Sequence, residues 1–174
     1  MILTVDIQSA SAEPVPDEDD IRSWIAAALD GRNPQERCEV SVRLVDETEM
    51  ADLNNTYRGK PGPTNVLSFP ASIAAEVDDG LLGDIVICAP VVHAEARTQG
   101  KDPSAHWAHM AVHGTLHLLG YDHIEERAAQ QMEALESSIL NALDYPCPYR
   151  HDSVGGNGVL NAVIDSTTGD QYPQ

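Results

Sequence analysis

Short alternating segments and longer segments of helical period follow one another along residues 1–145, and this order limits the fold more than any other feature. Apolar and polar residues alternate in residues 2–8 and 38–45, as in strands with one buried face. The more continuous apolar runs at 65–70 and 81–89 predict two further strands. Four strands separated by helical segments indicate one domain with a single sheet.

Five segments combine helical apolar spacing with end signals, and we expect helices at residues 17–31, 46–54, 90–100, 102–119 and 124–143. Acidic residues open the first of them and complement its helix dipole. Asp46, with Glu49 three residues later, has the pattern of a capping box. The predicted fold class is therefore α+β (α/β-like), with about five helices packed on one roughly four-stranded mixed sheet.

The periodic pattern ends near residue 146. The remaining segment has little charge and three glycines within residues 155–158. Such a segment lacks the apolar periodicity that would pack it on a core. We predict one domain at 1–145 and a flexible C-terminal tail at 146–174.

The net charge is −18, from 10 basic and 28 acidic residues. A chain this acidic is repelled by nucleic acid unless its few cations gather in one place. Arg58 with Lys60, and Arg97 with Lys101, are four of these cations. The sequence does not show whether they are neighbours in space.

The three cysteines, Cys38, Cys88 and Cys147, lie far apart and form no CxxC pair. The sequence therefore predicts neither a disulfide framework nor a thiolate metal site. No segment has the pattern of a signal peptide, and no apolar run approaches membrane-spanning length. We expect a cytoplasmic protein that does not contact membranes.

The segment HGTLHLLGYDH, residues 113–123, carries the strongest chemical signal. His113 and His117 lie one helical turn apart on one face, and Gly120 ends the helix so that His123 can return toward them. Three neutral imidazoles suit Zn²⁺ and leave a fourth position for water, as in catalytic zinc sites. We predict that His113, His117 and His123 bind one zinc ion per chain that supports hydrolysis.

Three other residues in or next to this segment leave alternatives open. His106 and His109 precede it on nearly the same helical face, and we expect plain helix-surface histidines. A role for either beside the metal or the substrate is the alternative. Asp122 suits two roles equally, orienting a ligand histidine or capping the last helix.

The spacing HxxxHxxGxxH is also that of metzincin proteases, and one residue argues against that class. Their motif places a glutamate directly after the first histidine to serve as general base. Gly114 occupies this position here. A metallopeptidase or other metallohydrolase is therefore the weaker interpretation.

Together with residues 113–123, two further segments give the chain a resemblance to the YbeY family of bacterial endoribonucleases and rRNA-maturation factors. LNNTYRGKPGPTNVLSFP, residues 53–70, is similar to a family signature with an arginine before a loop and a strand. LGDIVI, residues 82–87, is similar to a third. The resemblance covers residues 1–145 and departs at Asn65, where the family pattern usually has aspartate.

The resemblance implies a single-strand-specific, metal-dependent endoribonuclease that acts in 16S rRNA 3′-end maturation and ribosome quality control. It implies rRNA and a ribosomal subunit or ribosomal proteins as partners, and metal ligands at His113, His117 and His123. The family's functionally important arginine falls on Arg58. A guanidinium can meet two phosphate oxygens at once, so Arg58 is the expected catalytic residue. A non-catalytic ribosome-assembly factor with a structural metal is a further alternative.

Overall fold

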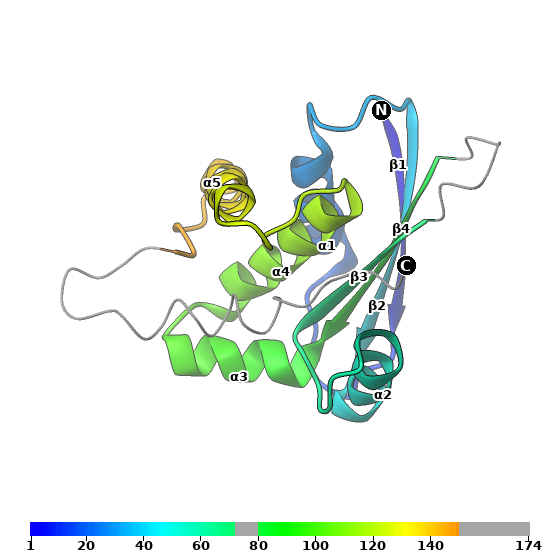
Figure 1. Ribbon diagram of the computed structural model, residues 1–174, viewed down its shortest axis with the longest axis vertical. Helices are drawn as coiled ribbons and strands as arrows, with labels where there is room; N and C mark the ends of the chain where they lie inside the picture. The colour runs from blue at the N-terminus through cyan, green and yellow to red at the C-terminus, as the bar shows by residue number, and fades with distance from the viewer. Residues whose placement is uncertain (72–79, 150–174) are drawn as a thin grey trace.

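A computed structural model describes residues 1–71 and 80–149, and these form five helices packed on one four-stranded mixed sheet (Figure 1). This confirms the α+β fold with a mixed sheet that the alternating pattern predicted. The elements in chain order are β1 (Ile2–Ser9), α1 (Glu18–Leu29), β2 (Arg37–Val45), α2 (Glu47–Arg58), β3 (Val66–Pro70), β4 (Leu81–Cys88), α3 (Ala89–Gln99), α4 (Pro103–Leu118) and α5 (Glu126–Ala142).

The strand order in the sheet is β1-β2-β4-β3. β1 pairs with β2 and β2 with β4 in parallel, while β3 pairs with β4 antiparallel and forms one edge. Residues 72–79, between β3 and β4, lie outside the described residues. The parallel pairs are possible because helices supply the crossover connections.

The two faces of the sheet are covered by different helices (Figure 1). Val40, Val42 and Leu44 of β2 are buried in one cluster with side chains of α1, α4 and α5. On the other face, α2 packs Met50 against Leu67 and Val86, which belong to β3 and β4. The alternation along β2 and β4 thus separates two apolar layers.

α4 is the central helix of the larger layer. Every residue from His106 to Leu118 is buried, and α4 contacts α1, α3, α5, β3 and β4. At Gly114 the helix approaches the sheet so closely that Ser68 Oγ donates to the Gly114 carbonyl at 2.9 Å. A helix that is apolar nearly all round is expected to be buried, and here it carries the histidines into the interior.

The capping box predicted at Asp46 is wrong. Asp46 does precede α2, but its side chain makes no cap hydrogen bond. Its carboxylate instead accepts hydrogen bonds from the Ser11 hydroxyl and, at 3.0 Å, from the Ala12 amide. A contact with a segment more than thirty residues away replaces the local one.

No helix within the described ranges is long and apolar enough to cross a bilayer.

Gly83 of β4 is expected to tolerate no side chain. Its φ is +147°, and an added Cβ would lie 2.3 Å from the Phe69 carbonyl oxygen. Because this contact is to backbone, we expect Gly83→Ala to lower the free energy of unfolding by about 3 kcal/mol. Gly31→Ala is the matched control, since Gly31 also has a positive φ but no atom within 4 Å of the added Cβ. Urea denaturation should show a loss of only about 1 kcal/mol there, and equal losses would contradict the steric argument.

Candidate metal centre

The structure brings the three predicted histidines together. His113 and His117 project from α4, and His123 follows the end of that helix. The ring centroids are 4.5 Å apart for His113 and His117, 5.1 Å for His117 and His123, and 5.7 Å for His113 and His123. One ring nitrogen of each histidine lies within 4.8 Å of the others. This cluster could hold a metal ion.

The end of α4 explains why His123 returns to the helix. Gly120 adopts a φ of +96°, and its amide bonds to the His117 carbonyl at 3.0 Å. The chain then turns back, and Asp122 Oδ1 accepts a hydrogen bond from the Ile124 amide at 2.6 Å. Neither role considered for Asp122 is seen in its hydrogen bonding, because this side chain shapes the loop between α4 and α5.

The geometry of His113 and His117, and the protonation of His117, fit a metal ion. Their Nε2 atoms are 3.0 Å apart. Two nitrogens bound to one zinc ion at roughly 2.0–2.1 Å with tetrahedral angles lie about 3.3–3.4 Å apart, so little movement is needed. Burial, followed by the neighbouring His113 and His123, lowers the pKa of His117 to about 2. The imidazole is therefore neutral, which is the form that binds metals.

A buried carboxylate that sequence reasoning did not find lies behind the cluster. Glu136 of α5 is fully buried, and its Oε1 bonds to Nδ1 of His113. Its Oε2 bonds to His109 Nε2 at 3.0 Å and accepts from the Tyr149 hydroxyl. Burial acts to raise the pKa of Glu136, but His113 and His109 outweigh it and hold the pKa well below its usual range. The sequence signal was available, since Glu136 interrupts the apolar stripe of α5.

His106 and His109 are buried, so the prediction of helix-surface histidines is wrong. Burial lowers the pKa of His109 to about 4, which leaves it neutral beside Glu136. His106 Nε2 lies 3.0 Å from the Glu95 carboxylate. Asn65 Nδ2 donates to the same carboxylate at 3.0 Å. An aspartate at position 65 would bring a second negative charge to Glu95, so asparagine suits this chain.

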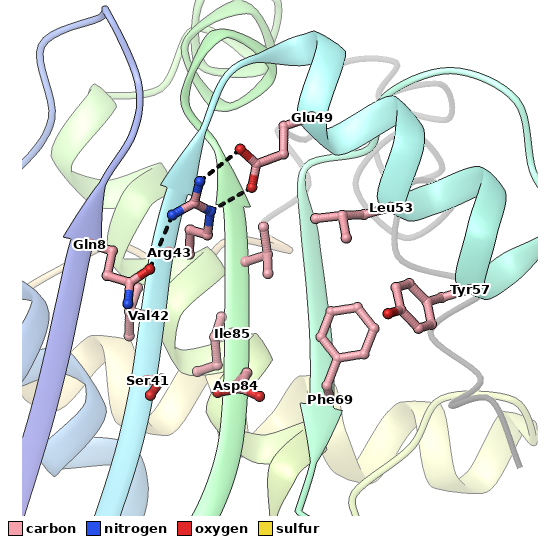
Figure 2. A pocket seen from close by; sticks show the side chains of 11 residues that line it. Gln8, Ser41, Val42, Arg43, Glu49, Leu53, Tyr57, Phe69, Asp84 and Ile85 are labelled. Atoms are coloured by element: carbon pink, nitrogen blue, oxygen red, sulfur yellow. Dashed lines mark hydrogen bonds and ion pairs between the residues drawn. The ribbon is translucent and has the colours of Figure 1, made fainter.

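Arg58 is half-buried and is the last residue of α2, directly before Gly59 with a φ of 65°. The end of α2 lies beside the edge strand β3, because the Tyr57 ring packs edge-on against Phe69 with centroids 5.1 Å apart (Figure 2). The next residue back, Ser68, bonds α4 at Gly114. The helix that carries Arg58 and the helix that carries the histidines therefore flank one short strand.

A groove of about 480 Å³ lies between α2 and the sheet (Figure 2). Arg43 lines this groove, with Nη2 2.9 Å from Glu49 Oε1 and Nη1 3.0 Å from Gln8 Oε1. Its described lining residues include no histidine. The groove is therefore distinct from the histidine cluster.

Residues 146–149, at the start of the segment predicted as a tail, contact the domain. Lys101 Nζ donates to the Pro148 carbonyl at 3.3 Å, and the Tyr149 hydroxyl reaches Glu136. Tyr149 also packs edge-on against His109 with centroids 5.4 Å apart. The rest of that segment, 150–174, lies outside the described residues.

The family described as Endoribonuclease YbeY matches residues 6–144. This chain belongs to the YbeY family. An endoribonuclease YbeY of Pseudomonas syringae pv. tomato is 53% identical over 152 residues, covering 87% of this chain and 90% of that protein. One of Methylococcus capsulatus is 54% identical over 149 residues, covering 86% of this chain and 97% of that protein.

The fold also matches a solved structure, the solution structure of TM1509 from Thermotoga maritima. The TM-score is 0.56 at 23% sequence identity, and the match covers 85% of this chain and 100% of that one. This likeness supports the fold that the structure gives this chain.

Proposed function

We propose that this chain is a zinc-dependent endoribonuclease that cleaves single-stranded RNA, with His113, His117 and His123 as metal ligands and Arg58 as the catalytic residue. Its substrate in the cell is the 3′ end of 16S rRNA, and it also serves ribosome quality control. The observation that carries the proposal is the convergence of three histidines in a member of the YbeY endoribonuclease family.

The donor set favours zinc over harder ions. Three imidazole nitrogens with no carboxylate among them suit zinc, whereas magnesium and calcium prefer oxygen ligands. A zinc ion held there would lower the pKa of bound water and could polarise a phosphoryl oxygen. The chain itself holds these imidazoles in place, since His113 is 4% and His117 2% exposed, and burial keeps His117 neutral.

The place of Arg58 supports a role on the scissile phosphate. It ends α2 beside β3, and α4 packs on the other face of that strand. A guanidinium presents two parallel N–H groups to the non-bridging oxygens, where negative charge builds up during cleavage. A phosphodiester is therefore a better substrate for this set of residues than a peptide.

Position 114 argues further against a metzincin-like peptidase. A Cβ at Gly114 would lie 2.9 Å from Ile85 Cγ2 and 3.2 Å from Ser68 Oγ. A glutamate has no room there, because this side of α4 packs against the sheet. The general base of a metzincin cannot be restored at this position by substitution.

The charge of the chain supports a basic protein partner. With a net charge of −18, the protein is repelled by bare RNA but attracted to basic surfaces. Ribosomal proteins on a ribosomal subunit have that character. We therefore propose that a ribosomal subunit delivers the RNA end to the site, in the cytoplasm.

The proposed activity can be tested with the full chain. We expect zinc-loaded protein to cut a single-stranded RNA that carries the 16S rRNA 3′ end, and to leave a duplex of the same sequence intact. Chelation should remove the activity and added zinc should restore it. Casein in a parallel reaction should stay uncut. Casein cleavage would favour the peptidase, and zinc-loaded protein without RNase activity would favour the assembly factor.

A further inference from the structure

Glu136 is a buried carboxylate to which the proposed function has given no role. It projects from α5 toward His109 and His113 of α4 and has no exposed surface. A carboxylate is almost never fully buried unless it is paired, because leaving water costs several kcal/mol. Its partners therefore indicate what keeps it there.

Both oxygens of this carboxylate are occupied. His109 Nε2 and the Tyr149 hydroxyl share Oε2, and His113 Nδ1 takes Oε1. Within the described residues, no lysine or arginine forms an ion pair with Glu136. Three hydrogen-bonding groups therefore hold the carboxylate, and of these three His113 alone bonds Oε1.

We propose that Glu136 is a positioning residue for His113, holding the Nδ1–H of that ring so that Nε2 presents its lone pair to the ion shared with His117 and His123. This inference rests on the proposed metal site. Because Nδ1 carries the proton, Nε2 is the nitrogen left for the ion. His113 Nε2 lies 3.0 Å from His117 Nε2, so the orientation that Glu136 imposes is the one the pair needs.

His109 and Tyr149 help to keep Glu136 in place by bonding its other carboxylate oxygen, Oε2. Since both bond Oε2, the carboxylate cannot rotate away from His113 without losing two hydrogen bonds. A histidine whose second nitrogen is held by a carboxylate is also a stronger metal ligand, because the negative charge raises its basicity. Glu136 thus fixes both the direction and the strength of one ligand.

Zinc affinity, measured by competition with a chromophoric chelator, tests the proposal in three variants of the full chain. Glu136→Asp keeps the charge but withdraws it by one methylene, and Glu136→Gln keeps the length but removes the charge. We expect each to weaken zinc binding 10–100-fold. Glu126→Gln is the matched control, because it makes the same charge change at an exposed site on α5 and should bind zinc as the wild type does.

A second readout separates positioning from general stability. Long-range ¹H–¹⁵N spectra of the metal-free wild type should show His113 as the Nδ1–H tautomer, and Glu136→Asp should lose this preference while its melting stays cooperative. Unchanged zinc affinity in both Glu136 variants, beside tight wild-type binding, would overturn the role of Glu136 alone. Wild-type protein that binds no zinc would overturn the proposed metal site. If neither variant folds, an Nε2–H tautomer of His113 in the wild type would overturn the inference.

Discussion

His117→Ala is expected to abolish both zinc binding and RNA cleavage. The imidazole of His117 is buried between His113 and His123, and alanine would leave only two of the three proposed ligands. Zinc contributes several kcal/mol to charge stabilisation in reactions of this kind, so cleavage should fall about a thousand-fold or more. Elemental analysis of protein purified without chelator, together with single-turnover cleavage of single-stranded RNA, would measure both losses.

His93→Ala is the matched control for this loss. His93 Nε2 accepts a hydrogen bond from Trp107 Nε1 at 3.0 Å, and His93 Nδ1 lies 2.6 Å from Glu13 Oε2, so it stabilises the fold away from the histidine cluster. We expect a lower melting temperature with zinc content and cleavage unchanged. Cleavage by His117→Ala at the wild-type rate would show that the proposed site is not the active site.

Arg58→Ala should lower RNA cleavage by two to three orders of magnitude while zinc content and stability stay close to those of the wild type. The expected loss, about 3 kcal/mol, is that of removing one donor from a developing oxyanion. Lysine should restore only part of the rate, because it lacks the planar fork that grips two oxygens. The cleavage rate under single-turnover conditions is the measurement, with zinc content determined on the same samples.

Arg22→Ala provides the charge-matched control for Arg58. Arg22 lies on α1 with its side chain 41% exposed and Nη1 3.0 Å from Asp19 Oδ1, so its loss changes the net charge equally and touches no site residue. If Arg22→Ala and Arg58→Ala slow cleavage to the same extent, the effect is one of overall charge. Wild-type cleavage by Arg58→Ala would refute the catalytic role.

Local signals account for the parts of the structure that the sequence predicted. The helix carrying His113 and His117 was predicted at residues 102–119 and is observed at Pro103–Leu118, because Asp102, Pro103 and Gly120 are start and stop signals read within a few residues. The one-turn separation of His113 and His117 was also predictable, because it follows from their spacing of four residues within one helix. Their convergence with His123 required only that Gly120 end the helix.

Contacts between distant segments account for what the sequence did not predict. His109 and Glu136 are 27 positions apart, and only the docking of α5 on α4 brings them together. The same docking buries His109, which was expected on the surface. Asp46 was expected to cap its own helix and instead bonds Ser11. In each case a tertiary hydrogen bond outweighed a pattern that was read along the chain.

The burial of α4 has a consequence for how the protein responds to a changing metal supply. In a zinc finger the ion supplies the folding energy, and the chain unfolds when the ion is removed. Here α4 is ordered by its contacts with α1, α5 and the sheet, so His113 and His117 keep their spacing without an ion. We therefore expect that an ion at the proposed site can leave and be replaced while the chain stays folded. With the proposed zinc site, we expect the apolar core to set the lifetime of the protein in a metal-poor cell, and activity to return when zinc does.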